Sequence, residues 1–144
     1  MLKGSLPEVY LDTDVAFDII SKRQPFFETA VRLVEWVAQD KIALVIGECS
    51  LANLIYLSFD IYKLPNAQER LNDFISVCHV ISGGKRQMME ALASNFSDKE
   101  DALQYYTALH HGVDYFVTRN IHDCKTAFGS LPVSTPEEFL SSFE

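Results

Sequence analysis

Short apolar runs that alternate with stretches of helical periodicity constrain the fold of this chain more than any other feature. The run at 42–46 is continuous and rich in β-branched residues, which is typical of a strand covered on both faces. Similar runs predict strands at 9–11, 77–81 and 115–117, and a short fifth strand at 131–133. Strands that alternate with helices are joined by right-handed crossovers. The pattern therefore predicts the α/β class, as a three-layer α/β/α sandwich with a central parallel sheet of four or five strands.

Capping residues mark where some of the intervening helices begin and end. Ser97 and Glu100 have the spacing of a capping box. The helix that they open is expected to run through His111, because Gly112 can end it in the left-handed conformation. Another capping signal starts at Thr135, which is followed by a proline and, three residues on, by a glutamate. These signals predict a long helix before the fourth strand and a short helix at the end of the chain.

Length and composition predict one folded domain over residues 1–144. The chain has the length of a single domain, and 48% of its residues are hydrophobic, as in globular proteins. Its three cysteines form no C-x-x-C pair, which argues against disulfides and zinc and favours a reducing, cytoplasmic location. No segment reaches the roughly 18 apolar residues of a membrane span, so we expect no membrane partner.

The formal net charge of −8 is unusual for a protein that binds nucleic acid. Phosphate contacts, the main source of affinity for nucleic acids, need lysine and arginine. Bound cations could neutralise part of the acidic excess, and basic residues could still gather locally. The residues that could form such a patch are Lys22, Arg23, Lys85, Arg86, Arg119 and Lys125.

Acidic residues follow two of the predicted strands. Asp12 and Asp14 come directly after the first strand, and Asp123 comes after the fourth. Asp101 lies in the first turn of the helix before that fourth strand. Ligands of an open parallel sheet bind beyond the carboxyl ends of its strands, so we expect these side chains to lie close together. Carboxylate oxygens select Mg²⁺ or Mn²⁺, which bind through one or two carboxylates, waters and substrate phosphate. The sequence therefore predicts a metal site suited to phosphoryl chemistry.

Several segments resemble the motifs of PIN domains. Residues 10–15, Tyr-Leu-Asp-Thr-Asp-Val, resemble the first strand of the family, and 50–56 and 100–105 resemble its third helix and its Asp-Ala motif. Residues 118–123, Thr-Arg-Asn-x-x-Asp, resemble its fourth motif, and 136–140, Pro-Glu-Glu-Phe-Leu, the ending of one bacterial branch. The resemblance covers nearly the entire chain. It implies a PIN-like fold and a Mg²⁺- or Mn²⁺-dependent endoribonuclease that acts on RNA. It also implies a VapC-like toxin of a toxin–antitoxin pair, commonly a homodimer inhibited by an antitoxin protein.

The same resemblance implies roles for individual residues. Asp12 and Asp101 match metal ligands of the family. Asn53 stands where active members usually carry Glu, and Asn120 where they usually carry Asp, which leaves Asp123 as the remaining carboxylate of its motif. Fewer negative charges imply weaker metal binding. The expected metal ligands are Asp12, Asp101 and Asp123; the expected catalytic set adds Asn120; the expected auxiliary contacts are Asn53, Asp14, Thr118 and Arg119.

Two other functions stay open at this point. A non-catalytic PIN-like protein would keep the fold for partner binding while its metal site had weakened, as the two asparagines suggest. Alternatively, Asp12-x-Asp14 after an apolar strand resembles the nucleophile motif of haloacid-dehalogenase-type phosphatases, in which an aspartyl phosphate forms. Glu48, five residues before Asn53, is expected to belong to the end of a strand and not to a helix.

Overall fold

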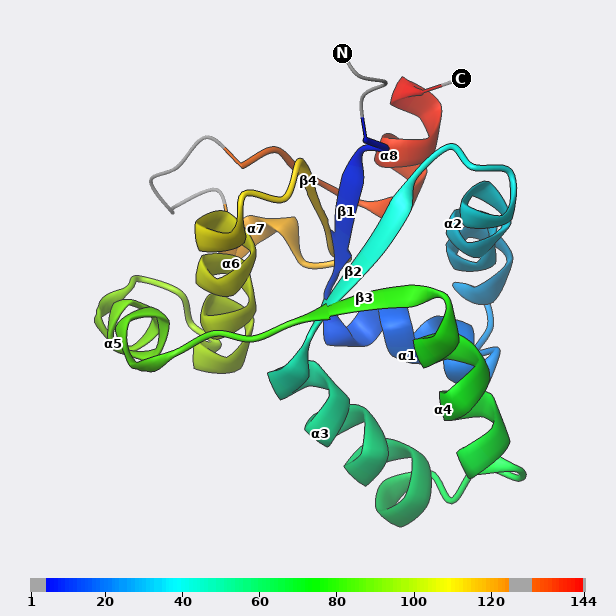
Figure 1. Ribbon diagram of the computed structural model, residues 1–144. Coiled ribbons are helices and arrows are strands. Elements are labelled where there is room, and N and C mark those ends of the chain that lie inside the picture. The colour runs from blue at the N-terminus through cyan, green and yellow to red at the C-terminus, as the bar shows by residue number, and fades with distance from the viewer. Residues whose placement is uncertain (1–4, 125–130, 144) are drawn as a thin grey trace.

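The computed structural model describes residues 5–124 and 131–143 (Figure 1). Its centre is a five-stranded sheet with the order β3-β2-β1-β4-β5, in which every neighbouring pair is parallel. The predicted parallel sheet is confirmed, and the fifth strand begins two residues later and ends one residue later than expected. Lys125, one of the basic residues considered above, lies outside the described residues. The strands are β1 (Glu8–Leu11), β2 (Ala43–Gly47), β3 (Cys78–Ile81), β4 (Tyr115–Val117) and β5 (Val133–Ser134).

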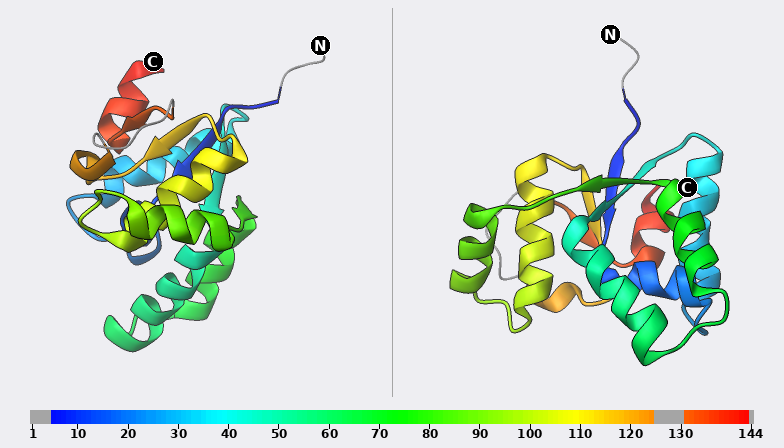
Figure 2. Two further views of the ribbon diagram at one scale, coloured as in Figure 1. Left: turned by 90° about the vertical axis from the view of Figure 1, so that its left-hand side faces the viewer. Right: turned by 60° about the horizontal axis from the view of Figure 1, so that its bottom comes forward.

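Helices cover both faces of this sheet (Figures 1 and 2). On one face pack α1 (Thr13–Ser21), α2 (Phe27–Ala38), α4 (Ala67–Ser76) and α8 (Pro136–Ser142). The other face is covered by α5 (Lys85–Ala93), α6 (Lys99–His111) and α7 (Ile121–Cys124). After β2, α3 (Glu48–Tyr56) continues into the π-helical segment η1 (Leu57–Ile61). The three-layer α/β/α sandwich predicted from the sequence is therefore confirmed.

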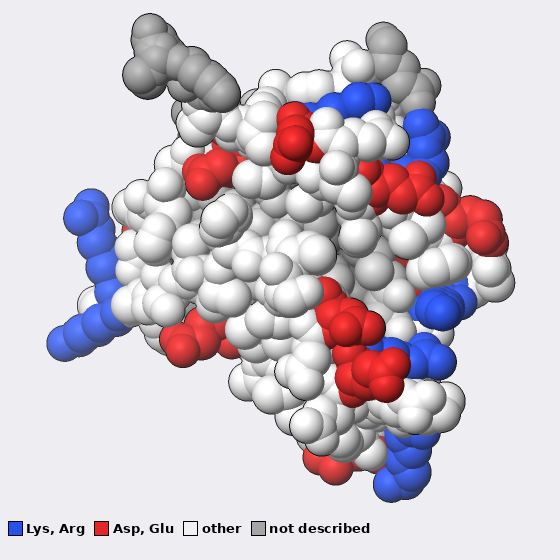
Figure 3. Space-filling model, turned by 45° about the vertical axis from the view of Figure 1, so that its right-hand side comes forward, with Lys and Arg blue, Asp and Glu red and all other residues white. Residues whose placement is uncertain are grey.

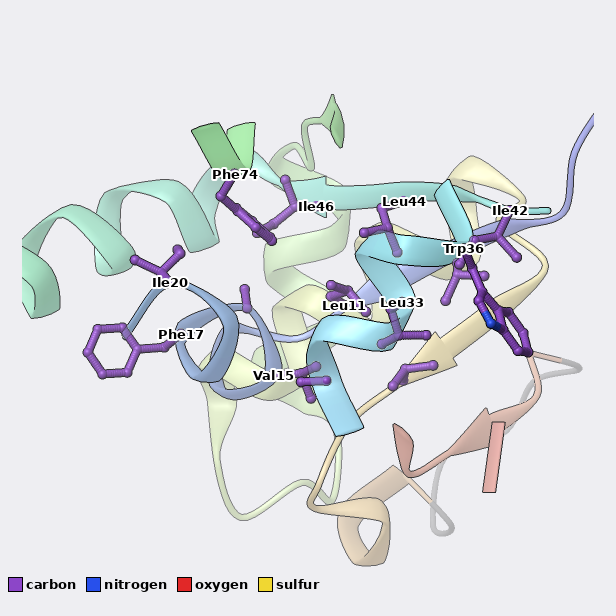
Figure 4. Packing of buried hydrophobic residues seen from close by; sticks show 14 of the residues in the cluster. Leu11, Val15, Phe17, Ile20, Leu33, Trp36, Ile42, Leu44, Ile46 and Phe74 are labelled. Carbon is purple, nitrogen blue, oxygen red and sulfur yellow. The ribbon is translucent and has the colours of Figure 1, made fainter. Parts of the chain in front are cut away.

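Alternation along the strands divides the core into two clusters. Val9 and Leu11 of β1 point into the cluster with α1 and α2, whereas Tyr10 between them points into the cluster with α6. In β2, Leu44 and Val45 alternate in the same way. Figure 4 shows part of the first cluster, where side chains of β1, β2, α1 and α2 interdigitate. Both faces are buried at β2 and β4, which explains why these strands are continuous apolar runs in the sequence.

Two predicted helix starts are wrong, and one helix start and one helix end are confirmed. The residue that caps α6 is Asp98 and not Ser97, because the Asp98 carboxylate accepts hydrogen bonds from the first-turn amides. Glu48 is the first residue of α3 and not the end of a strand. Gly112 ends α6 with φ 73°, and Thr135 opens α8 with the expected capping box. None of the helices described is long and apolar enough to cross a membrane.

Gly47 lets the last residue of β2 lie against the buried ring of Tyr10. A Cβ at Gly47 would overlap the Tyr10 hydroxyl, and the Tyr10 hydroxyl also donates a long hydrogen bond of 3.5 Å to Gln104 Oε1. The Tyr10 ring stacks on Phe116 of β4 at 5.2 Å between centroids. Tyr10 therefore joins β2, β1 and β4 at their carboxyl ends, and any atom added at Gly47 disturbs that contact.

We expect Gly47→Ala to destabilise the protein by about 1–3 kcal/mol, because the added methyl group overlaps the Tyr10 hydroxyl. In a Tyr10→Phe background the overlap is removed, and the penalty of the same substitution should fall well below its value in the wild-type background. Urea unfolding of the four proteins measures both penalties. Equal penalties in the two backgrounds would show that the Tyr10 hydroxyl is not the cause.

Candidate metal centre

Asp12 lies at the point where β1 ends and α1 begins. Its side chain is buried, with 3% of its surface exposed. One carboxylate oxygen, Oδ1, accepts a hydrogen bond of 3.0 Å from the amide of Val15 and so caps α1. The other, Oδ2, accepts a hydrogen bond from the hydroxyl of Thr118, the first residue after β4. Burial raises the pKa of Asp12 to about 6, although both hydrogen bonds oppose the shift. Asp12 is thus a fixed carboxylate that retains its charge only at a free-energy cost.

Asp101 lies in the first turn of α6, in the field of several other carboxylates. Burial raises its pKa most, and the charges of Asp98, Asp12, Asp14 and Glu100 raise it further, to about 7. These residues come from the end of β1 and from the start of α6, far apart in the sequence. The structure therefore brings Asp12, Asp14 and Asp101 into one electrostatic neighbourhood, as the sequence predicted. A bound cation would offset this crowding of like charges.

Asn53 faces a carboxylate that the sequence analysis had treated only as a helix cap. Its Nδ2 donates a hydrogen bond of 2.7 Å to Oε1 of Glu100, which joins α3 to the start of α6. Burial and the charges of Asp98 and Asp14 raise the pKa of Glu100, and the hydrogen bond from Asn53 lowers it. The acidic group at the contact of α3 and α6 is thus supplied by Glu100, and Asn53 is its neutral donor.

Asp123 lies in the short helix α7 and is buried, with 8% of its surface exposed. Its Oδ2 accepts a hydrogen bond of 2.7 Å from the hydroxyl of Ser97, which lowers the pKa of Asp123. No group of three His, Cys, Asp or Glu side chains within residues 5–124 and 131–143 is placed to hold a metal ion. Among these residues the expected convergence of Asp12, Asp101 and Asp123 on one ion is therefore not found. The ligand role of each residue remains a prediction.

The pKa of the Cys124 thiol is raised by burial and by the charges of all three carboxylates. Burial raises its pKa to about 12, and the charges of Asp101, Asp12 and Asp123 contribute in that order. Cys124 is 7% exposed and packs with the residues of α6. The charges of all three carboxylates therefore act on the same buried thiol.

A buried polar network that the sequence analysis missed connects α1, α3 and α6. Gln104 Oε1 accepts hydrogen bonds from the Thr13 amide at 3.1 Å and from the Ser50 hydroxyl at 2.9 Å. The Thr13 hydroxyl in turn donates to Ser50 at 3.0 Å. All three residues are buried. The sequence could have indicated this network, because Gln104 and Ser50 are polar residues at positions of α6 and α3 that face the core. This network fixes the start of α1, and with it Asp12, relative to the helix that carries Asp101.

The remaining predicted contacts, Arg119, Asn120 and Asp14, differ in how firmly they are held. Arg119 Nε donates to Oδ2 of the buried Asp18 at 2.9 Å, and its guanidinium lies 3.9 Å from the centre of the Phe26 ring. Burial raises the pKa of Asp18, and its two arginine partners lower it. The Asn120 amide donates to the Thr118 hydroxyl at 3.0 Å. The side chains of Asn120 and Asp14 are exposed at the same edge of the sheet.

The donors at this edge fit a small divalent cation. Mg²⁺ binds through one or two carboxylates, keeps several waters and takes further oxygens from substrate phosphate. Asp12 and Asp101 form such a pair, with Glu100 and Asp14 nearby. Figure 3 shows a different face of the molecule, where a broad uncharged area separates the charged groups and basic side chains form no continuous surface. Hard oxygen donors are the feature that the carboxyl edge of the sheet offers to a ligand.

Comparisons with known proteins agree with the fold. The sequence model of the family described as PIN domain matches residues 8–122. Ribonuclease VapC1 of Aquifex aeolicus (strain VF5) is 24% identical over 137 residues, which cover 92% of each chain. VapBC2 from Rickettsia felis, bound to a DNA fragment from its promoter, contains a chain that aligns with a TM-score of 0.69 at 20% identity, over 89% of this chain and 98% of that one. VapC20 of Mycobacterium tuberculosis, a sarcin-ricin loop cleaving toxin, aligns with a TM-score of 0.61 at 12% identity, over 83% of this chain and 95% of that one.

The raised pKa values make the stability of the metal-free protein depend on pH. Since the pKa of Asp12 is about 6 and that of Asp101 about 7, both above the ordinary 3.8, the folded protein binds protons that the unfolded chain releases. Their contribution to stability is complete below about pH 4 and is lost as the pH rises towards about 7. We therefore expect Asp101→Asn to raise the Tm at about pH 7.5 by about 2–5 °C and to change it little at about pH 4.5.

Thermal unfolding followed by circular dichroism in a chelating buffer measures this effect. Asp40→Asn is the control, because Asp40 is exposed, lies after α2 at the other edge of the sheet and has a positive φ that asparagine tolerates. An Asp101→Asn protein that is no more stable than the wild type at about pH 7.5 would show that the neighbouring carboxylates do not repel the charge of Asp101.

Proposed function

Because this chain belongs to the PIN domain family, we propose that it is a divalent-metal-dependent endoribonuclease, which hydrolyses phosphodiester bonds of RNA as the toxin of a toxin–antitoxin pair. The observation that carries this proposal is the pair Asp12 and Asp101, in which the negative charge of the buried Asp12 raises the pKa of the partly buried Asp101. Such a pair costs stability and needs a cation to offset it. The similarity to a ribonuclease over 92% of the chain adds support for the substrate class.

Asp12 and Asp101 would hold the metal, one or two ions of Mg²⁺ or Mn²⁺, and Asp123 remains a predicted ligand whose Oδ2 is oriented by Ser97. When bound, the metal lowers the pKa of a coordinated water and stabilises the charge that develops on the scissile phosphate. The Thr118 hydroxyl and the Val15 amide each hold one oxygen of Asp12, so the orientation of the carboxylate is set before any ligand arrives. Asp14 and Asn120, exposed beside Asp12, are placed to contact the substrate or the metal-bound waters.

The partners that we propose are an antitoxin protein and a second copy of the chain. Support comes from the fold shared with proteins solved as VapBC complexes, among them the DNA-bound VapBC of Salmonella typhimurium, with a TM-score of 0.66 at 18% identity over 91% of this chain and 99% of that one. We place the protein in the cytoplasm, since Cys49, Cys78 and Cys124 are free thiols that suit a reducing compartment.

A non-catalytic PIN-like binding protein is the second candidate. Two observations favour it: Asn53 is engaged with Glu100, and Asp123 is engaged with Ser97. Calorimetry with Mn²⁺ separates the two functions, since a nuclease site needs binding in the micromolar range and a decayed site would not bind at millimolar concentration. The phosphatase alternative is no longer open, because the chain belongs to a different family.

The nuclease proposal predicts cleavage of single-stranded RNA that is stimulated by Mn²⁺ and abolished by a chelator. Asp12→Asn and Asp101→Asn should each lower the rate by at least about a hundredfold, because each removes a charge that holds the metal. Asp40→Asn removes the same charge at the far edge of the sheet and should leave the rate unchanged. Gel analysis of a 5′-labelled RNA measures all four proteins. Cleavage that persists in both site variants rules out the assigned centre.

A further inference from the structure

Two arginines that are far apart in the chain meet on one buried carboxylate. Asp18 of α1 is 1% exposed, and its Oδ1 accepts a hydrogen bond of 2.9 Å from Nε of Arg23. Its Oδ2 accepts a hydrogen bond of 2.9 Å from Nε of Arg119. The side chains of Arg23 and Arg119 are 31% and 30% exposed. One arginine would neutralise Asp18, so these two residues, the arginine pair, leave an excess positive charge.

The backbone brings both members of the arginine pair to Asp18. Arg119 directly follows Thr118, at the carboxyl end of β4. On the other side, α1 ends at Lys22, whose left-handed φ of 60° turns the chain back. The Arg23 amide then donates to the Asp18 carbonyl at 3.3 Å, which sets the Arg23 side chain beside the Asp18 carboxylate. Of the basic residues that could gather locally, the structure thus brings these two together.

Aromatic rings support the arginine pair, and some of its donors stay available to a ligand. The Arg119 guanidinium lies 3.9 Å from the centre of the Phe26 ring, and that of Arg23 lies 5.1 Å from the centre of the Phe17 ring. Figure 4 shows Phe17 projecting from α1 at one end of the first core cluster. In the part of the chain that the structure describes, neither guanidinium forms an ion pair with a carboxylate other than Asp18. An arginine has five N–H donors in a planar fork that matches phosphate, so the Nη nitrogens of Arg119 can still bind an anion.

The arginine pair adjoins the candidate metal centre. Arg119 directly follows Thr118, whose hydroxyl donates to the Asp12 carboxylate. Burial raises the pKa of Asp12, and the positive charge of Arg119 is among the causes that lower it, so the guanidinium lies within electrostatic reach of this carboxylate. Asp18 lies about 9 Å of helix rise beyond Asp12. One phosphate group does not span that separation, so an anion on the arginine pair would be the neighbour of one at the metal.

We propose that Arg23 and Arg119 together bind a backbone phosphate of the RNA, the neighbour of the phosphate that is cleaved, and that Asp18 is the positioning residue that orients both guanidinium groups. The inference rests on the proposed ribonuclease function. It identifies where a chain with a net charge of −8 gains affinity for RNA. A bound phosphate would take the remaining arginine donors and offset the excess positive charge of the cluster. An ion pair that only stabilised the fold would bind no phosphate.

The first test is a titration of the metal-free protein with inorganic phosphate, followed by the side-chain Nε–H resonances of its arginines. We expect the resonances of Arg23 and Arg119 to shift along one saturable curve. The resonance of Arg86, which is exposed on α5 at the other face of the sheet, should not saturate. Arg119→Lys keeps the positive charge and removes the planar fork, so the affinity should fall about fivefold. Shifts that are absent, or an equal affinity in Arg119→Lys, overturn the proposal.

The positioning role of Asp18 is tested in the same titration with Asp18→Asn. Because this substitution removes a negative charge beside the anion, charge alone predicts stronger phosphate binding. A positioning role predicts binding about threefold weaker, since the two guanidinium groups lose the carboxylate that orients them. Binding that is equal or stronger overturns this role. Hydrogen exchange of the Nε–H groups tests it without a variant, because exchange in Arg23 and Arg119 as fast as in Arg86 also overturns it.

The second test measures whether the phosphate belongs to RNA. Binding of a single-stranded RNA in chelating buffer, at several salt concentrations, gives the slope of log K against log salt. Arg119→Gln should reduce the magnitude of this slope by about 0.7, the loss of one phosphate contact with a single strand. Arg23 stays paired with Asp18 in this variant, so the buried carboxylate keeps a partner. Lys41→Gln, which removes a positive charge before β2 at the opposite edge of the sheet, should leave the slope unchanged. An unchanged slope in Arg119→Gln overturns the assignment to RNA.

The two tests also separate this inference from the ribonuclease proposal. Phosphate and RNA binding are measured without metal, so they do not depend on cleavage. If RNA binds with the expected dependence on Arg119 but is not cleaved with Mn²⁺, the ribonuclease function fails and the phosphate site stands. If RNA is cleaved and the slope does not respond to Arg119, the phosphate site fails and the ribonuclease function stands.

Discussion

The parallel pairing of β1 with β4 is the constraint on which the candidate site depends. It brings Asp12 and Thr118 to the same edge, where the amide of Asp12 donates to the Val117 carbonyl at 3.1 Å and the hydroxyl of Thr118 donates to the Asp12 carboxylate. The same residue then caps α1 through Val15. One side chain thus ends a strand, begins a helix and joins two neighbouring strands. Its position follows from the backbone of the sheet and not from a flexible loop.

The carboxylates at this edge lower the stability of the metal-free protein, and the fold compensates in two ways. Amides at the beginning of α1 and of α6 stabilise the negative charge, as the Val15 amide does for Asp12. The network around Gln104 connects α1, α3 and α6 through groups that are buried and bonded to one another. The carboxylates still repel one another despite these hydrogen bonds, as is typical of sites that bind a cation or act in catalysis.

Most of the fold could be predicted from the sequence because both faces of the sheet are covered. The central strands β2 and β4 are then continuous apolar runs, Gly112 gives a clear helix end and Thr135 a clear helix start. The start of α6 was assigned wrongly because Ser97 and Asp98 both have capping side chains, and the choice depends on a distant residue, Asp123. The positions of Asp12 and Asp101 followed from topology alone. The partners of Asn53, Arg119 and Asp123 did not, since each is a contact between segments far apart in the chain.

The central claim is that Asp12 and Asp101 bind one divalent cation between them. Anomalous diffraction from crystals of the full chain equilibrated with Mn²⁺ tests it most directly, because the metal itself is located. The account predicts a peak within about 2.2 Å of a carboxylate oxygen of Asp12 and of Asp101, with waters completing the coordination. Crystals in which Mn²⁺ is absent from this edge of the sheet, or binds without contact to either residue, would contradict the claim.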